Sequence, residues 1–160
     1  MKTQIGITDG NRQAVVDLLN ALLADEYVLY TEARNFHWNV VGPDFRDLHK
    51  FFEEQYEGLD DIIDDTAERA RALGGNAVAT LGEFLKAARL KEKPGQYPGS
   101  ATMLQRLLED HEAVIRTLRM DLAACAEKYG DMGTSDFLTG IMEQHEKMAW
   151  MARAFLENRS

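Results

Sequence analysis

Four long segments of this chain carry apolar side chains at spacings of three and four residues, and no strand-like alternation persists between them. They run from about residue 9 to 40, 44 to 73, 100 to 129 and 134 to 157. An apolar stripe of this kind buries one face of a helix against its neighbours. The pattern predicts an all-α protein in which four helices, each roughly 40 Å long at 1.5 Å per residue, pack around one core.

The breaks between the segments predict how the helices are connected. Proline disfavours helical geometry in the preceding residue, so the first helix should stop at Gly42-Pro43. The second should end at Gly74-Gly75, a helix-terminating signal. The connection that follows, residues 74–100, has about 27 residues and includes an expected short helix around residues 81–88. A connection of that length can run along the bundle, which predicts the single long crossover of a ferritin-like four-helix bundle; a decorated up-and-down bundle is the alternative.

Composition indicates one ordinary globular domain spanning residues 1–160. Hydrophobic residues make up 45% and charged residues 28% of the chain. The apolar runs are too short to span a membrane, and the polar start MKTQIGITDGNRQ lacks the apolar core of a secretory signal, so a cytoplasmic location is expected. The single cysteine, Cys125, lies in an apolar helical pattern and is expected to be a small buried hydrophobe.

Potential metal ligands cluster in the second helical segment. At 100° per residue, with His49 at zero, Glu53 falls at about 40°, Asp64 at about 60° and Glu68 at about 100°, all on one stripe. His37, just before the Gly-Pro break, can fold back beside His49. Imidazole nitrogen combined with carboxylate oxygen suits Fe(II), Mn(II) or Zn(II), whereas a set without thiolates argues against a structural zinc finger. The donor set therefore predicts a metal site here.

One chain cannot complete such a site. His49 and Asp64 are fifteen residues apart, about 22 Å along a straight helix, so they cannot hold the same ion. If two copies pair these helices antiparallel about a twofold axis, the histidine end of one meets the acidic end of the other, giving two equivalent sites. A site inside one bundle normally uses Glu-x-x-His pairs, and the sequence has none. The alternative is that the acids form a solvated face, and His111 and His145, in apolar stripes, are expected to be core or capping histidines.

The residues from 37 to 75 closely resemble the signature of the Dps family, the ferritin-like DNA-binding proteins from starved cells. The resemblance extends over nearly the whole chain, and DMGTSDFLTGIMEQHEKMAWMARAFL is similar to the last helix of the family. The matching elements in the first stretch are His37-Trp38, Gly42, Phe45, Leu48-His49, Phe52, Tyr56, Asp64, Glu68-Arg69 and Leu73-Gly74-Gly75.

This resemblance implies a hollow dodecamer of four-helix subunits with di-iron ferroxidase centres at the twofold interfaces. By position, His37 and His49 come from one subunit and Asp64 and Glu68 from its mate, while Glu53 occupies a place in or beside the ligand shell where the family commonly has aspartate. In the family, Fe(II) is oxidised, preferentially by hydrogen peroxide, and Fe(III) is stored as mineral in the cavity, which protects against oxidative damage. Trp38, next to His37, would shield the centre or act as an oxidisable relay; the alternative is an aromatic that packs at the helix end.

Iron entry and DNA binding are the remaining expectations from the resemblance. Asp131 and Asp136 are candidates for the acids of threefold entry channels, although Thr134, Ser135 and Asp136 also suit helix capping.

Family members commonly bind DNA through lysine-rich tails, whereas here the ends offer only Lys2, Arg12 and Arg159. The net charge of −9 per chain becomes on the order of −100 in a dodecamer, which opposes duplex binding. A nucleoid-compacting protein with secondary metal binding is the alternative function, with the cluster of Lys86, Arg89, Lys91 and Lys93 as its candidate basic patch. A helical scaffold with an acidic surface is a third.

Overall fold

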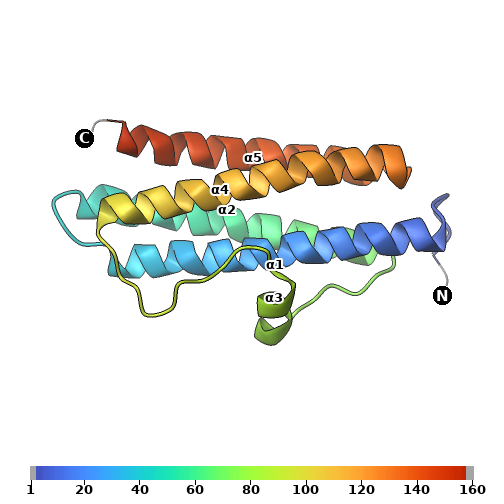
Figure 1. Ribbon diagram of the computed structural model, residues 1–160, viewed down its shortest axis with the longest axis horizontal. Helices are drawn as coiled ribbons and strands as arrows, with labels where there is room; N and C mark the ends of the chain where they lie inside the picture. Colours follow the sequence, from blue (N-terminus) through green and yellow to red (C-terminus); the bar gives the residue numbers. More distant parts are fainter. Residues whose placement is uncertain (1–2, 158–160) are drawn as a thin grey trace.

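The computed structural model describes residues 3–157, which form a bundle of long helices with no strand in that range (Figure 1). The elements are α1 (Asp9–Asn39), α2 (Phe45–Ala72), α3 (Leu81–Ala87), α4 (Ser100–Ala123), a π-helical turn η1 (Ala124–Lys128) and α5 (Met132–Leu156). The all-α prediction is confirmed, and the expected helix ends agree with the structure to within about two residues, except at the end of α4.

Two antiparallel helix pairs, α1 with α2 and α4 with α5, make up the bundle. The connection between α2 and α4 runs along the outside, carries the short helix α3 and starts α4 beside the start of α2 (Figure 1). This is the predicted single crossover rather than an up-and-down order. The α1 helix also packs on α4, and α2 on α5, so α1 and α5 face each other across one diagonal of the bundle.

Local chemistry accounts for the helix ends. At the end of α2, Gly74 has φ +82°, and the N–H of Gly75 donates to the carbonyl of Ala70, closing the helix in a Schellman-type turn. Thr80 and Glu83 form a reciprocal capping box at the start of α3. The predicted continuation of α4 to residue 129 ends instead in η1, where the Tyr129 N–H bonds to the carbonyl of Ala124.

The core runs the length of the bundle. One cluster centres on Phe36, Phe52 and Leu104, and a second on Leu19, Ile62 and Leu118. Cys125 is fully buried in the second cluster, and burial raises the pKa of its thiol to about 11, so its expected role as an inert packing residue is confirmed. Among residues 3–157, none of the helices combines the length and the apolar character needed to cross a bilayer.

Candidate metal centre

The two predicted histidine ligands lie against each other where α1 ends and α2 begins. The imidazole rings of His37 and His49 stack with their centroids 3.7 Å apart and their planes at 20°. Each ring nitrogen Nδ1 donates to the other residue's backbone carbonyl: His37 to His49 at 2.7 Å, and His49 to His37 at 2.8 Å. The turn at Gly42-Pro43 brings the helix ends into this reciprocal arrangement.

This reciprocal bonding determines which nitrogen can bind a metal ion. A carbonyl oxygen only accepts hydrogen bonds, so Nδ1 must carry the proton on both rings, and Nε2 of each keeps a lone pair. Metal-binding histidines are typically oriented in this way, by a hydrogen bond from the nitrogen that does not bind the ion. His37 is only 8% exposed, so its ring cannot easily turn away. The pair is therefore preorganised to donate two imidazole nitrogens.

Aromatic and basic side chains frame the histidine pair. Phe45 stacks on His49 at 5.1 Å, and Tyr56 meets the edge of His37 at 5.3 Å. Trp38 is 66% exposed, and the Arg34 guanidinium lies 5.1 Å from its ring centroid. The Trp38 side chain therefore does not pack into its own bundle, and it leaves an apolar surface beside the histidines.

The predicted acids are divided between the two ends of α2. Glu53 lies one turn after His49, close enough for the two imidazoles to influence it electrostatically. A hydrogen bond from Lys50 at 2.7 Å lowers the pKa of Glu53, and His37 and His49 act in the same direction, so its carboxylate is ionised at neutral pH. Asp64 and Glu68 lie on the exposed side of α2 toward its other end.

Three of the five predicted ligands, His37, His49 and Glu53, lie near the start of α2 in a single subunit. Asp64 is fifteen residues beyond His49 on the same continuous helix, about 22 Å away along its axis, as the sequence predicted. In the described part of the chain, no three histidine, cysteine or acidic side chains are already placed to hold one ion. The predicted ligands are thus divided between the two ends of one helix.

Comparisons with known proteins assign this fold and signature to a family. The ferritin-like domain model matches residues 16–160. A DNA protection during starvation protein from Bacillus anthracis is 42% identical over 147 residues, which cover 91% of this chain and 98% of the relative. The chain belongs to the Dps family. A low temperature-induced protein of Nostoc is 47% identical over 158 residues, 99% of this chain and 88% of that protein.

A solved Dps structure shows the same fold over the whole subunit. The Dps protein from Vibrio cholerae O1, described as a member of a broad superfamily of ferritin-like diiron-carboxylate proteins, is 30% identical to this chain. It superimposes with a TM-score of 0.88 over 98% of this chain and 100% of the Vibrio chain. The ferritin-like bundle expected for this Dps chain is therefore confirmed.

The two candidate channel acids of this Dps chain differ in their surroundings. Asp131 is 4% exposed and caps α5: its carboxylate accepts from the Thr134 N–H at 2.9 Å and from the Thr134 hydroxyl at 2.6 Å, and it pairs with Arg69 at 3.3 Å. The capping residue is thus Asp131 itself, and α5 starts two residues earlier than predicted. Asp136 is exposed, so its carboxylate remains available to a solvent channel.

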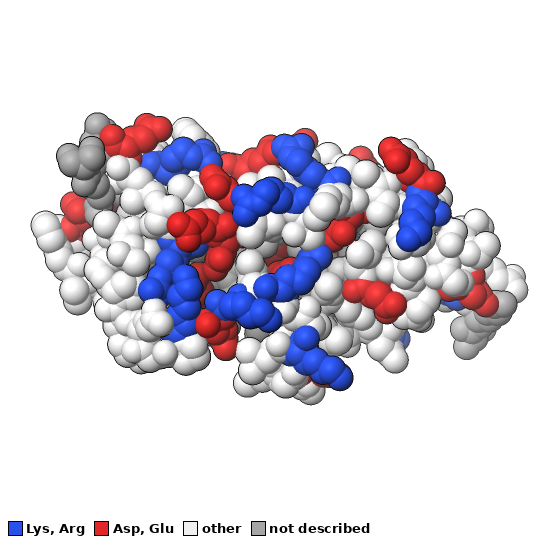
Figure 2. Space-filling model, viewed as in Figure 1, with Lys and Arg blue, Asp and Glu red and all other residues white. Residues whose placement is uncertain are grey.

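Two of the basic residues considered for DNA binding, Arg12 and Arg89, already have partners in the Dps bundle. Arg12 donates to the Leu73 carbonyl at 3.2 Å, and Arg89 pairs with Asp25 at 2.6 Å and with Asp121 at 3.3 Å. Figure 2 shows basic and acidic side chains intermingled on the face it draws, rather than one basic patch. Lys2 and Arg159 lie outside the described residues.

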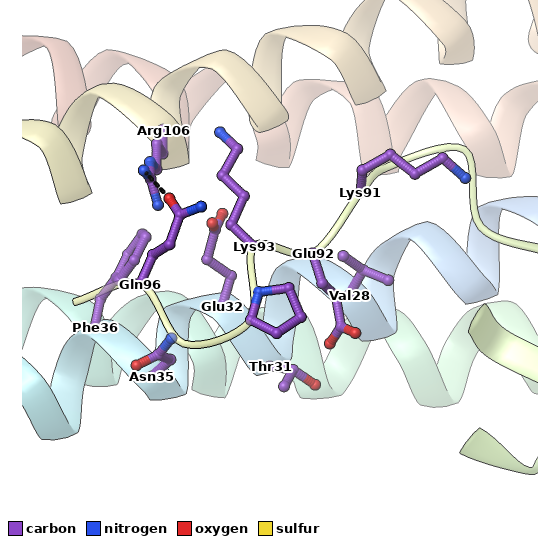
Figure 3. Close-up of a pocket in the computed structure, with 11 residues that line it drawn as sticks. Val28, Thr31, Glu32, Asn35, Phe36, Lys91, Glu92, Lys93, Gln96 and Arg106 are labelled. Carbon is purple, nitrogen blue, oxygen red and sulfur yellow. Dashed lines mark hydrogen bonds between the residues drawn. The ribbon is translucent and has the colours of Figure 1, made fainter. Parts of the chain in front are cut away.

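A cleft of about 170 Å³ lies apart from the histidine pair, between α1, α4 and the crossover (Figure 3). Its wall includes Glu32, Lys93 and Arg106, and the guanidinium of Arg106 donates to the Gln96 amide oxygen at 2.7 Å. Burial, together with a hydrogen bond to Asp110 and its charge, raises the pKa of Glu32 to about 8. Glu32 therefore holds a proton at neutral pH, which suits an acid that docks the crossover rather than a metal ligand.

The structure also shows a buried polar cluster that the sequence pattern did not reveal. His111 and His145 are completely buried, as expected for core histidines, but they are joined to Glu26 and Gln55, which are 0% and 2% exposed. The available sequence signal was that Glu26 and Gln55 interrupt the inward faces of α1 and α2.

Proposed function

We propose that this Dps chain is an iron-binding mini-ferritin that oxidises Fe(II), with hydrogen peroxide as the preferred oxidant, at centres shared between two subunits. The Fe(III) product is stored as mineral inside a hollow dodecamer, and consuming iron and peroxide together protects the cell from oxidative damage. Fe(II) is the substrate, and the chain assembles with copies of itself.

The observation that carries this proposal is the stacked, carbonyl-anchored pair of His37 and His49, with Asp64 and Glu68 at the far end of the same helix. Two free Nε2 lone pairs at one end and two exposed carboxylates at the other are complementary halves. An antiparallel pairing of two α2 helices about a twofold axis joins these halves into two identical sites. The exposed Trp38 and Val41 give such an interface apolar side chains to bury.

The donor set suits this chemistry. Carboxylate oxygens favour the harder Fe(III) over Fe(II), so they make iron easier to oxidise, while imidazole binds Fe(II) well. Each of two Fe(II) ions gives up one electron, and the two electrons break the O–O bond of one peroxide molecule to yield water after protonation. Two irons held close together therefore reduce peroxide completely, without releasing a hydroxyl radical. Glu53, ionised and one turn from His49, adds negative charge that attracts Fe(II).

A complementation experiment tests whether the centre is shared between subunits. The His37→Ala/His49→Ala variant lacks the nitrogen half, and the Asp64→Asn/Glu68→Gln variant lacks the acidic half. Each variant alone should lose the fast, peroxide-dependent oxidation of Fe(II) added anaerobically. When the two variants are coexpressed in equal amounts, half of the randomly formed subunit pairs contain one copy of each variant. Each such mixed pair regains one of its two sites, so activity should return to about a quarter of the parent value.

The controls make the outcome decisive. Glu54→Gln/Asp65→Asn removes two exposed acids of α2 that lie at about 140° and 160° from His49, outside the stripe, and this variant should oxidise iron like the parent. The assembly mass of every variant is measured by light scattering, and the iron content of the particles after loading reports storage. Coexpression that restores no activity would refute the shared centre, as would undiminished oxidation by the His37→Ala/His49→Ala variant.

A further inference from the structure

A chain of four polar side chains crosses the buried core of the bundle and has one contributor from each long helix. Gln55 of α2 contacts His111 of α4, His111 contacts His145 of α5, and His145 contacts Glu26 of α1. Three of the four are completely buried, and Gln55 is 2% exposed. None belongs to the stripe of His49, Glu53, Asp64 and Glu68, so this cluster has no part in the shared centre.

The protons along this chain can be assigned one contact at a time. The Gln55 amide oxygen lies 2.9 Å from Nε2 of His111 and accepts its proton. Burial, and then the neighbouring His145, lower the pKa of His111 well below its ordinary value, so this ring is neutral and its Nδ1 is an acceptor. That Nδ1 lies 2.9 Å from Nδ1 of His145, which must donate. In the neutral ring, Nε2 of His145 then carries a lone pair.

This lone pair faces a carboxylate. Nε2 of His145 and Oε1 of Glu26 are 2.9 Å apart, yet both carboxylate oxygens and the nitrogen lack a hydrogen-bond partner. At that distance, only a poor angle excludes a hydrogen bond, so the oxygen lies off the axis along which the nitrogen would carry a proton. If the Gln55 amide were rotated by 180°, its NH2 group would donate to Nε2 of His111, and the proton of His145 would move from Nδ1 to Nε2. The Glu26 carboxylate would still lie off the direction of that N–H bond.

A cation between these two atoms would be held by both of them, and the off-axis geometry fits an ion larger than a proton. If each atom lies about 2.1 Å from a shared ion, a separation of 2.9 Å gives an angle of about 90° at the ion, the angle between neighbouring ligands in octahedral coordination. Within residues 3–157, Glu26 forms no ion pair with lysine or arginine, and its one charge partner in that range is the His145 ring.

We propose that Glu26 and His145 bind one divalent first-row transition-metal ion inside each subunit, with His111 and Gln55 holding the His145 ring in its metal-binding tautomer. Water completes the coordination, and a bound water can lose a proton to offset the remaining charge. The chain from His145 through His111 to Gln55 is the hydrogen-bonded support that metal-binding histidines characteristically have on their other nitrogen. This site lies within one subunit and does not depend on the shared centre or on how the subunits pair.

An approach from solvent leads to the start of this chain. A cleft of about 310 Å³ between α2 and α5 is lined by Gln55, and flexible side chains make up much of the remaining wall. The lining residues are Glu54, Gln55, Gln144, Lys147, Met148 and Met151.

Anaerobic Co(II) binding tests the proposal in a His37→Ala/His49→Ala background, which removes the imidazoles of the shared centre. Equilibrium dialysis gives the number of ions per chain, visible absorption reports the ligand set, and thermal unfolding reports stabilisation. The background protein should bind one Co(II) per chain at the bundle site, and its unfolding temperature should rise with Co(II) concentration. Adding Glu26→Gln, which keeps size and shape, should remove this ion and the stabilisation.

Three further variants complete the test. Adding Asp17→Asn, an exposed acid on α1, should leave Co(II) binding unchanged. His145→Gln should abolish binding by removing the other donor, and circular dichroism confirms that it folds. Gln55→Leu should weaken binding about tenfold, because it touches only the supporting chain. A background protein that binds no Co(II), or a Glu26→Gln variant that binds as many ions as the background, would overturn the proposal.

Discussion

Replacing Glu32 with glutamine should make the protein more stable, by an amount that grows with pH. Glu32 lies in the wall of the cleft under the crossover, where burial and the neighbouring Asp110 raise its pKa from 4.5 to about 8. In the unfolded chain its carboxyl ionises near pH 4.5, while in the folded protein it keeps its proton up to about pH 8. The stabilising contribution of this group is therefore complete below pH 4.5 and is lost as pH rises toward and through 8.

The size of this effect follows from the pKa difference. Between pH 4.5 and pH 8, each unit of pH lowers the free energy of unfolding by about 1.4 kcal/mol. The loss of stability is therefore about 3 kcal/mol at pH 7 and about 5 kcal/mol above pH 8. Glutamine has nearly the same shape, carries no charge at any pH and can still donate to Asp110. The advantage of Glu32→Gln over the parent should therefore be small near pH 5 and level off above pH 8.

Thermal unfolding at fixed protein concentration, repeated from pH 5 to pH 9, measures this advantage. For a chain of this size, 1 kcal/mol shifts the unfolding temperature by about 2–4 °C, so the difference at pH 8.5 should be on the order of 10 °C or more. Glu109→Gln, which removes an exposed acid beside Asp110, is the matched control and should show a small difference that does not grow with pH. A constant offset between Glu32→Gln and the parent at all pH values would refute the reasoning.

Three further outcomes are expected. Asp131→Ala should destabilise the fold by about 3 kcal/mol in chemical unfolding, because it removes the cap of α5 and leaves Arg69 without its buried partner. Asp131→Asn should cost less, and equal losses in the two variants would contradict a role for the charge. Thr80→Ala should cost about 1 kcal/mol by opening the capping box of α3, and hydrogen exchange should rise in α3 but not in α4. In gel-shift titrations the assembled protein should not retard duplex DNA at physiological salt, because its charge opposes binding; retardation at that salt would reverse this expectation.

Helical periodicity and chain breaks were enough to predict the fold. Regular apolar spacing, Gly42-Pro43 and Gly74-Gly75 act within a few residues of the chain, so their consequences can be seen without coordinates. The end of α4 was predicted less well, because the helix changes to a π-helical turn at Ala124–Lys128. A residue beyond this turn also contacts it: the Asp131 N–H donates to the Cys125 carbonyl.

The candidate centre was predictable in part. The stripe on α2 depends on helical geometry alone, and the structure keeps His49 and Asp64 far apart on one straight helix, as expected. The reciprocal bonds of His37 and His49 to each other's carbonyls were not predictable, because they depend on the exact path of the turn between α1 and α2. Those bonds determine which nitrogens keep a lone pair for the proposed iron centre.

The sequence by itself determined the helices, their order and the face of α2 that carries the candidate ligands, since these follow from local spacing. Only the tertiary structure decided which distant side chains meet: Asp131 with Arg69, Glu32 with Asp110, and Glu26 with His145 across the core. The spacing of residues along a helix gives the direction of each side chain but not its neighbour on another helix. That neighbour depends on how the helices are aligned along the bundle, and the packing of the whole core determines this alignment.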